Sequence, residues 1–218
     1  MSAGPRTRVA ILISGRGSNM VSLIEAAKAP DYPAEIVLVL SNRPEAGGLA
    51  HARSVGIPAH AIDHTTFSDR ATFDAALDAE LRAADVELVC LAGFMRIFSA
   101  GFAEAWAGRM INIHPSLLPL FKGTHTHAQA LAAGVRLHGC TVHYVVPELD
   151  AGPIVAQAAV PVRSGDDPDS LAARVIVQEH RLYPAALALV AGGRARLEGE
   201  RVVIDDDRGA ADAALLSL

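Results

Sequence analysis

Short apolar, β-branched runs alternate with longer amphipathic runs along most of this chain, and this alternation limits the folds open to it. The predicted strands cover residues 8–13, 34–41, 59–63, 87–92, 110–114, 139–146 and 154–162. The predicted helices cover residues 19–29, 46–54, 127–133 and 167–190, and one more runs from a cap at Ser68 or Asp69 to Ala83. Strands that alternate with helices favour the α/β class, with a Rossmann-like, mostly parallel sheet flanked by helices.

The carboxyl-terminal half of the chain departs from this pattern around Asp150. A short connection joins the predicted strands 139–146 and 154–162, which favours a hairpin and therefore antiparallel strands in this half. Pro168 suits the first turn of the helix that follows. A chain of 218 residues can bury a large core as one domain, which we place at residues 1–204. The charged, then alanine-rich stretch 198–218 is expected to be the least structured, and residues 205–218 form an unassigned tail.

The charge and the apolar content exclude some classes of partner. The net charge is −5, and Lys and Arg form no cluster, which argues against a nucleic-acid or anionic-membrane surface. No apolar segment approaches the length of a membrane span, so we expect a cytoplasmic protein. Cys90 and Cys140 each lie inside an apolar strand-like run, which favours buried free thiols over a disulfide.

The candidate catalytic residues are Asn112, His114 and Asp150. Asn112 and His114 are two apart in a predicted strand, so both side chains point to the same side. The amide can donate to a developing oxyanion, the imidazole can move a proton, and Asp150 can stabilise an imidazolium. Because no Ser or Cys nucleophile is evident, the set suggests direct transfer between two bound substrates. From local sequence alone, Asp150 also reads as a turn residue, and both roles can hold together.

The first strand-to-helix turn is a candidate phosphate site. Gly15 and Gly17 allow close approach of the backbone, and the N–H groups of Gly17, Ser18 and Asn19 lie at the positive end of the next helix. As a dinucleotide fingerprint the turn is weak, because Met20 stands at the third glycine position. A simple tight turn with a Ser or Asn helix cap is an equal alternative.

The histidines do not predict a metal site. His125 and His127 lie near His114 in the sequence, but residues two apart in a loop lack helical ligand spacing, and no carboxylate or cysteine completes a set. We therefore expect no metal. Most of the other histidines considered, which are His51, His60, His64 and His138, are expected at the surface.

Several motifs in the same order together resemble one known family. They are the segments 13–19, 91–96, 112–119, 122–127 and 178–180. The chain is similar over residues 9–204 to the glycinamide ribonucleotide formyltransferases, folate-dependent enzymes of purine synthesis. The resemblance implies the formyltransferase fold and two small-molecule ligands. These are a 10-formyltetrahydrofolate donor and glycinamide ribonucleotide, whose primary amine accepts the formyl group.

The resemblance also implies roles for individual residues. Asn112, His114 and Asp150 would be catalytic, with His114 as general acid/base, Asn112 as oxyanion donor and Asp150 tuning His114. Gly17, Ser18 and Asn19 would hold the phosphate of the acceptor, and Glu179 its ribose. The folate would be held by Arg70, by Met95, Arg96, Ile97 and Phe98, and by Val146, Pro147, Glu148, Leu149 and Asp150. Phe98 and Thr124 stand where leucine is common, so Phe98 changes the expected wall of the pterin pocket.

Related enzymes with the same core are the alternatives. A methionyl-tRNA formyltransferase is expected to have more sequence after the catalytic domain and a basic surface. A formyltetrahydrofolate hydrolase uses water as the acceptor and is expected to have a regulatory domain before the core. If the protein were a non-catalytic nucleotide-binding or redox module, the set of Asn112, His114 and Asp150 would have no function. The sequence leaves a monomer and a homodimer equally open.

Overall fold

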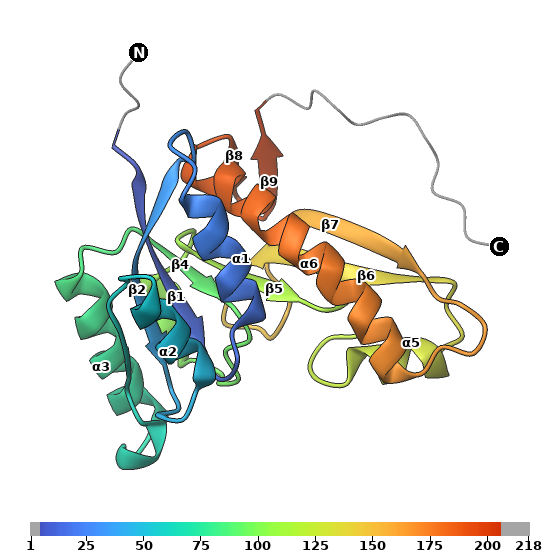
Figure 1. Cartoon of the computed structure of the whole chain (residues 1–218), viewed down its shortest axis with the longest axis horizontal. Helices are drawn as coiled ribbons and strands as arrows, with labels where there is room; N and C mark the ends of the chain where they lie inside the picture. The colour runs from blue at the N-terminus through green and yellow to red at the C-terminus, as the bar shows by residue number, and fades with distance from the viewer. Residues whose placement is uncertain (1–4, 206–218) are drawn as a thin grey trace.

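A seven-stranded sheet with helices on both faces forms the body of the protein (Figure 1). The computed structural model describes residues 5–205. The strands are β1 (Thr7–Ile13), β2 (Ala34–Ser41), β3 (Ala59–Ala61), β4 (Leu88–Leu91), β5 (Met110–His114), β6 (Leu137–Tyr144), β7 (Ile154–Pro161), β8 (Ala195–Glu198) and β9 (Arg201–Ile204). The helices are α1 (Ser18–Ala27), α2 (Gly47–Ser54), α3 (Arg70–Ala83), α4 (Ala100–Ala105), α5 (Thr126–Ala132) and α6 (Pro168–Ala191), with a 3₁₀ turn at His64–Thr66.

The sheet combines a parallel half with an antiparallel half. Its strand order is β3-β2-β1-β4-β5-β6-β7. The pairs from β3 to β5 are parallel, whereas β5 pairs antiparallel with β6 and β6 antiparallel with β7. The prediction of a Rossmann-like α/β sheet with antiparallel strands in the second half is therefore confirmed.

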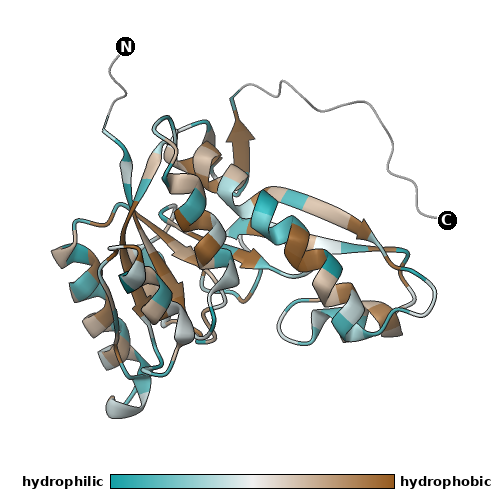
Figure 2. Ribbon diagram, viewed as in Figure 1, coloured by the Kyte–Doolittle hydropathy of each residue, from teal (hydrophilic) through white to brown (hydrophobic). Residues whose placement is uncertain are grey.

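The apolar residues of the central strands fill two cores, one on each face of the sheet. In β1, Val9, Ile11 and Ile13 pack with residues of α1, α2 and α6, while Ala10 and Leu12 pack with residues of α3 and α4. Successive strand residues point to opposite faces, so a continuous apolar run serves both cores. Figure 2 shows the central strands brown, with hydrophilic residues on the outer turns of the helices. Cys90 and Cys140 are buried free thiols, as predicted.

Helix ends follow the predicted capping chemistry. The Asp69 carboxylate accepts from the N–H of Thr72 at the start of α3. Asp167 and Ser170 form a capping box at the start of α6, with Pro168 in its first turn. By contrast, no side chain caps α1, which leaves its first N–H groups without a protein cap.

Four short elements were not predicted from the sequence, which are the 3₁₀ turn His64–Thr66, helix α4 and strands β8 and β9. Helix α4 has six residues and is capped by Ser99. Strands β8 and β9 form a hairpin that reaches into the stretch 198–204, so the expectation that this part is poorly structured was wrong. Each strand has four residues and little apolar periodicity, which leaves too weak a pattern to recognise. The predicted tail, apart from Asp205, lies outside the described residues. Within residues 5–205, no helix is long and apolar enough to cross a membrane.

Candidate active site

The candidate site residues converge where neighbouring parallel strands end. The turn 14–17 leaves the end of β1, and the loop 92–98 leaves the end of β4. Strand β1 lies beside β4, but the chain continues from β1 to β2 on one side and from β4 to β5 on the other. Such a switch point leaves a crevice at the carboxyl ends of the strands, the usual ligand site of open α/β sheets. The two loops are joined, because the N–H of Met95 donates to Oγ of Ser14 at 2.7 Å.

Strand β5 carries Asn112 and His114 on one face, and β6 adds a histidine that the sequence analysis missed. Asn112 pairs with His143 in the β5–β6 register, and Nδ2 of Asn112 lies 3.1 Å from Nε2 of His143. Nδ1 of His143 donates to the carbonyl of Tyr144 at 2.9 Å, so Nε2 has the free lone pair that accepts from Asn112. Burial lowers the pKa of His143, which favours this neutral form.

His114 lies between two oxygen atoms. Its Nε2 donates to the carbonyl of Phe121 at 3.0 Å, and its Nδ1 lies 3.5 Å from Oδ2 of Asp150. The side chains of His114 and Asp150 are 6% and 9% exposed, so water screens this pair little. An imidazole that faces a carbonyl and a carboxylate is well placed to carry a proton on each nitrogen. The predicted trio of Asn112, His114 and Asp150 is therefore brought together.

The loop after β6 holds Asp150 in an unusual backbone conformation. Asp150 has φ +48°, in the left-handed region, and its Oδ2 accepts from the N–H of Gly123 at 2.8 Å. Oδ1 of Asp150 lies 3.8 Å from Nε2 of His143, and the charge of Asp150 opposes the lowering of the His143 pKa by burial. A Cβ at Gly152 would collide with the carbonyl oxygen of Tyr144. The loop is therefore closely packed where it presents the carboxylate.

A pocket opens beside Asn112 between the loops that follow β4 and β6. Of the predicted folate-binding residues, it is lined by Arg96, Ile97, Phe98 and the whole segment from Val146 to Asp150. One wall is aromatic, because Phe98 stacks between Phe94 at 5.3 Å and Phe102 at 4.7 Å, measured between ring centroids. The pocket thus combines an apolar wall with polar groups at its inner end, as in many small-molecule sites.

Arg70 and Met95 lie outside this pocket. They line a more open depression beside it, together with Arg96 and Ile97. The guanidinium of Arg96 stacks over the ring of Phe73 at 4.6 Å, and Met95 is 62% exposed. The predicted folate-binding residues therefore form one continuous surface that runs from a narrow pocket to an open rim.

The turn 14–17 and helix α1 form the other half of the site. Gly17 has φ +73°, which only glycine adopts readily, and it precedes the uncapped start of α1. Nδ2 of Asn19 donates to Oε2 of Glu179 at 2.6 Å, so the residues predicted for phosphate and ribose lie together. Burial raises the pKa of Glu179, and the hydrogen bond from Asn19 opposes that shift. Uncapped N–H groups at a helix start suit an anion.

The remaining histidines include one pair that the sequence did not predict. Nδ1 of His127 lies 3.2 Å from Nε2 of His138, and His138 is fully buried, the exception among the four histidines of which most were expected at the surface. Burial, and then nearby His127, lowers the pKa of His138 to about 4. In the part of the chain that the structure describes, no three His, Cys, Asp or Glu side chains are arranged to hold a metal.

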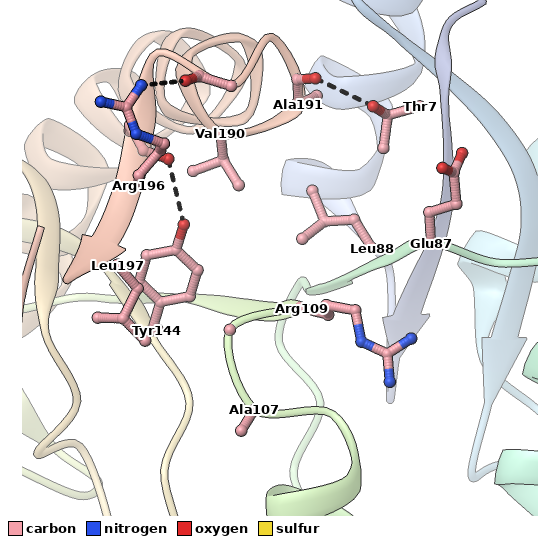
Figure 3. Close-up of a pocket in the computed structure, with 13 residues that line it drawn as sticks. Thr7, Glu87, Leu88, Ala107, Arg109, Tyr144, Val190, Ala191, Arg196 and Leu197 are labelled. Carbon is pink, nitrogen blue, oxygen red and sulfur yellow. Dashed lines mark hydrogen bonds between the residues drawn. The ribbon is translucent and has the colours of Figure 1, made fainter. Parts of the chain in front are cut away.

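A larger hollow of about 500 Å³ lies at the opposite ends of the strands (Figure 3). Its polar groups already have partners: Oγ1 of Thr7 donates to the carbonyl of Ala191, the hydroxyl of Tyr144 to that of Ala195, and Arg196 pairs with Asp205. It contains none of the predicted site residues. We therefore place the candidate active site at the smaller pocket, where the polar groups converge.

The fold and this group of residues define the class of formyl transferases. A family model described as Formyl transferase matches residues 7–187. Phosphoribosylglycinamide formyltransferase of Escherichia coli (strain K12) is 43% identical over 200 residues, which are 92% of this chain and 94% of the relative. The crystal structure of glycinamide ribonucleotide transformylase 1 from Symbiobacterium toebii has a TM-score of 0.89 and 44% identity, and the match covers 92% of this chain and 95% of that one. The chain belongs to the phosphoribosylglycinamide formyltransferase family.

Two further comparisons set limits on this assignment. The trifunctional purine biosynthetic protein adenosine-3 of Bos taurus is 50% identical over 192 residues, or 88% of this chain. The chain spans only 19% of the length of that relative. A formyltetrahydrofolate deformylase from Pseudomonas syringae has a TM-score of 0.85 at 26% identity, over 93% of this chain and 67% of the other. The same core fold therefore occurs in enzymes with different names.

Proposed function

We propose that the protein transfers the formyl group of 10-formyltetrahydrofolate to the primary amine of glycinamide ribonucleotide, a step of purine synthesis. One observation carries the proposal: Asn112, His114, His143 and Asp150 form one connected group beside a pocket, at the edge of the sheet where the uncapped helix α1 also starts. A transfer between two bound molecules needs two adjoining binding regions with the catalytic groups between them. The E. coli relative, named phosphoribosylglycinamide formyltransferase, supports the choice of substrates.

The folate occupies the pocket beside Asn112 in this proposal. The backbone of residues 146–150 can recognise the polar edge of a pterin, and the stacked ring of Phe98 supplies an apolar wall. Arg70 and Arg96 at the open rim can hold the carboxylates of the folate tail. We still expect no metal, because the groups proposed for the chemistry are an amide, an imidazole and a carboxylate.

The acceptor occupies the region beside α1. The N–H groups of Gly17, Ser18 and Asn19 bind its phosphate, and the Glu179 carboxylate accepts from the ribose hydroxyls. A phosphate needs no cluster of basic residues there, because backbone N–H groups and the helix dipole supply the positive potential. The acidic net charge of the chain, −5, is compatible with such local recognition.

The chemistry assigns one task to each catalytic group. The amine nitrogen attacks the formyl carbon, and the carbonyl electron pair moves to oxygen, where the second N–H of Asn112 donates to it. The oxygen electron pair then re-forms the carbonyl as the bond from carbon to folate nitrogen breaks, His114 gives its proton to that nitrogen, and the proton lost by the amine restores the one that His114 gave. Asp150 stabilises the charged ring of His114. Since Nε2 of His114 donates to Phe121 in this structure, proton transfer through that nitrogen requires the substrate to replace the carbonyl.

The decisive experiment is an assay with both ligands. The protein is incubated with glycinamide ribonucleotide and 10-formyltetrahydrofolate, and the appearance of deformylated folate is followed with and without the acceptor. We expect turnover only with the acceptor, and formylated ribonucleotide in an amount equal to the folate product. Glycinamide riboside without its phosphate is expected to be a poor substrate, because it loses charge-assisted hydrogen bonds of about 1.5–3 kcal/mol each.

A hydrolase is the second candidate, because the P. syringae deformylase shares the fold. It predicts rapid loss of the formyl group to water without any ribonucleotide. Full acceptor-free turnover would therefore replace the transferase proposal with the hydrolase. A single domain over residues 1–204, a cytoplasmic location and a monomeric or homodimeric state remain predictions; gel filtration with light scattering tests the last.

A further inference from the structure

Tyr183 of helix α6 lies against the strands that carry the site, although no predicted role includes it. Its side chain is fully buried, and its hydroxyl lies 3.0 Å from the carbonyl oxygen of Leu91 and 3.1 Å from that of Ile111. Leu91 is the last residue of β4, and Ile111 is the residue of β5 directly before Asn112, which pairs with Leu91. One hydroxyl therefore ties together two adjacent strands at the edge where the pocket opens.

The bonded carbonyls belong to peptides that lead directly into the site. The carbonyl of Ile111 is part of the peptide bond to Asn112, and that of Leu91 belongs to the peptide that starts the loop 92–98. Ile111 and Ile113 pack in the core on the α6 side. Because strand side chains alternate, Asn112 projects from the opposite face. Tyr183 therefore contacts β5 from the face of the sheet opposite to the one from which Asn112 projects.

The same helix also reaches the acceptor region. Glu179 lies about one turn before Tyr183 on α6, so the two side chains share a face of the helix. Glu179 accepts from Asn19 of α1, and the hydroxyl proton of Tyr183 is shared between the carbonyls of Leu91 and Ile111. Burial raises the pKa of Tyr183 well above its usual value of 10.0, so the hydroxyl remains a donor throughout the working pH range.

We propose that Tyr183 is a positioning residue for formyl transfer: its hydroxyl fixes β5, at the peptide before Asn112, against the end of β4 and so holds the amide of Asn112 where the oxyanion forms. The inference rests on the proposed function. An oxyanion donor must be held within a few tenths of an ångström of its productive position, because the stabilisation acts only in the transition state. A fixed hydroxyl shared by two strand carbonyls supplies that constraint without touching either substrate.

The test is Tyr183→Phe, which keeps the buried ring and removes only the hydroxyl. We expect kcat to fall about 10- to 100-fold, as small displacements of catalytic groups do, while KM for each ligand changes less than about threefold. The matched control is Tyr32→Phe, because the hydroxyl of Tyr32 also donates to a backbone carbonyl, but to that of Pro184 in α6 and not to a strand of the sheet. This control should keep the kcat of the unmodified protein. All assays use a temperature at which circular dichroism shows every variant folded.

A double-mutant cycle separates positioning from general destabilisation. If Tyr183 acts through Asn112, then Tyr183→Phe should lower kcat in the unmodified background but change it little in Asn112→Ala. Three results would each overturn this inference and leave the proposed function standing. They are an equal loss of kcat in both backgrounds, an unchanged kcat in Tyr183→Phe, and an equal loss of kcat in Tyr32→Phe. Absence of acceptor-dependent transfer in the unmodified protein would instead overturn the proposed function, and the inference with it.

Discussion

The amide of Asn112 donates to Nε2 of His143, 3.1 Å away on the neighbouring antiparallel strand. Since Nδ1 of His143 is occupied by the carbonyl of Tyr144, the ring can accept from Asn112 in only one way. This hydrogen bond fixes the orientation of the Asn112 side-chain amide, so that its NH₂ group and not its oxygen faces the site. The orientation of the proposed oxyanion donor therefore depends on a residue outside the predicted trio.

Replacing that histidine should expose its role. We expect His143→Phe to lower kcat by about tenfold, because the Asn112 amide loses a hydrogen bond of ~1–1.5 kcal/mol and can turn over. Steady-state kinetics with both ligands is the measurement, and KM should change little. The control is His60→Phe at a partly exposed histidine that pairs with Glu80. If His143→Phe keeps the full kcat, the amide is held by other contacts.

Substitutions of the proposed catalytic residues on β5, His114 and Asn112, should cause the largest losses of kcat. His114→Ala is expected to lower kcat by roughly two to four orders of magnitude, because general acid catalysis acts in the transition state. Asn112→Ala should cost roughly 10²–10³-fold through loss of an oxyanion donor. Calorimetric titration should show both ligands still binding. Near-normal turnover in either folded variant would contradict the assigned role.

A substitution at Gly17 tests the phosphate site. Gly17→Val introduces a side chain at φ +73°, where its Cβ meets Met20 at 3.2 Å, so the backbone cannot keep its approach to a phosphate. We expect the KM for glycinamide ribonucleotide to rise strongly and folate affinity to stay nearly unchanged. Gly101→Ala in α4 is the control, because its Cβ also meets no atom within 4 Å and no ligand role is proposed there. An equal loss of both ligands in Gly17→Val would argue for general disruption of the turn.

A substitution in the aromatic wall of the pocket should weaken the binding of folate and not that of the acceptor. Phe98→Leu removes the ring between Phe94 and Phe102, and stacked pairs contribute about 0.5–1.5 kcal/mol each. We expect folate to bind roughly 2- to 10-fold more weakly, with the KM for the acceptor unchanged. Isothermal titration of folate into both proteins checks this. Unchanged folate affinity would mean that the ring serves only the internal packing.

The buried pair of His127 and His138 predicts a pH dependence of stability. Burial lowers the pKa of His138 from 6.5 to about 4, so between these values the unfolded chain binds the extra proton and the folded protein does not. The free energy of unfolding should therefore fall as the pH falls through this window, by about 3 kcal/mol for this group. Urea titrations from pH 7 to 4.5 give the free energy of unfolding at each pH. Plotted against pH, this free energy should have a shallower slope for His138→Gln than for the unmodified protein. Equal slopes would contradict the shifted pKa.

Much of this molecule follows from local pattern. Apolar runs such as β1 predict a sheet buried on both faces, and the predicted cap Asp69 and the predicted first-turn residue Pro168 mark helix starts. The alternation of strand side chains is enough to put Asn112 and His114 on one face. These features depend on neighbours in the sequence, so a single sequence contains them.

Other features depend on contacts between distant segments. His143 enters the site only because β5 and β6 pair with Asn112 opposite it, and no local signal gives that register. The burial of His138 and the position of Tyr183 likewise follow from helix packing across the sheet. A search for polar residues at alternate positions of an apolar strand, such as Thr141 and His143, would have pointed to β6.

The glycine that follows the Asp150 loop bears on how this enzyme can diverge or be redesigned. With Gly152 against the carbonyl of Tyr144 and Asp150 at a positive φ, no ordinary side chain fits at position 152 without moving β6. Adaptation to another folate analogue must therefore take place elsewhere, at positions whose side chains are free to vary. Leu149, 50% exposed beside the pocket, is such a position, so libraries for altered ligand choice should vary it and leave the segment 150–152 intact.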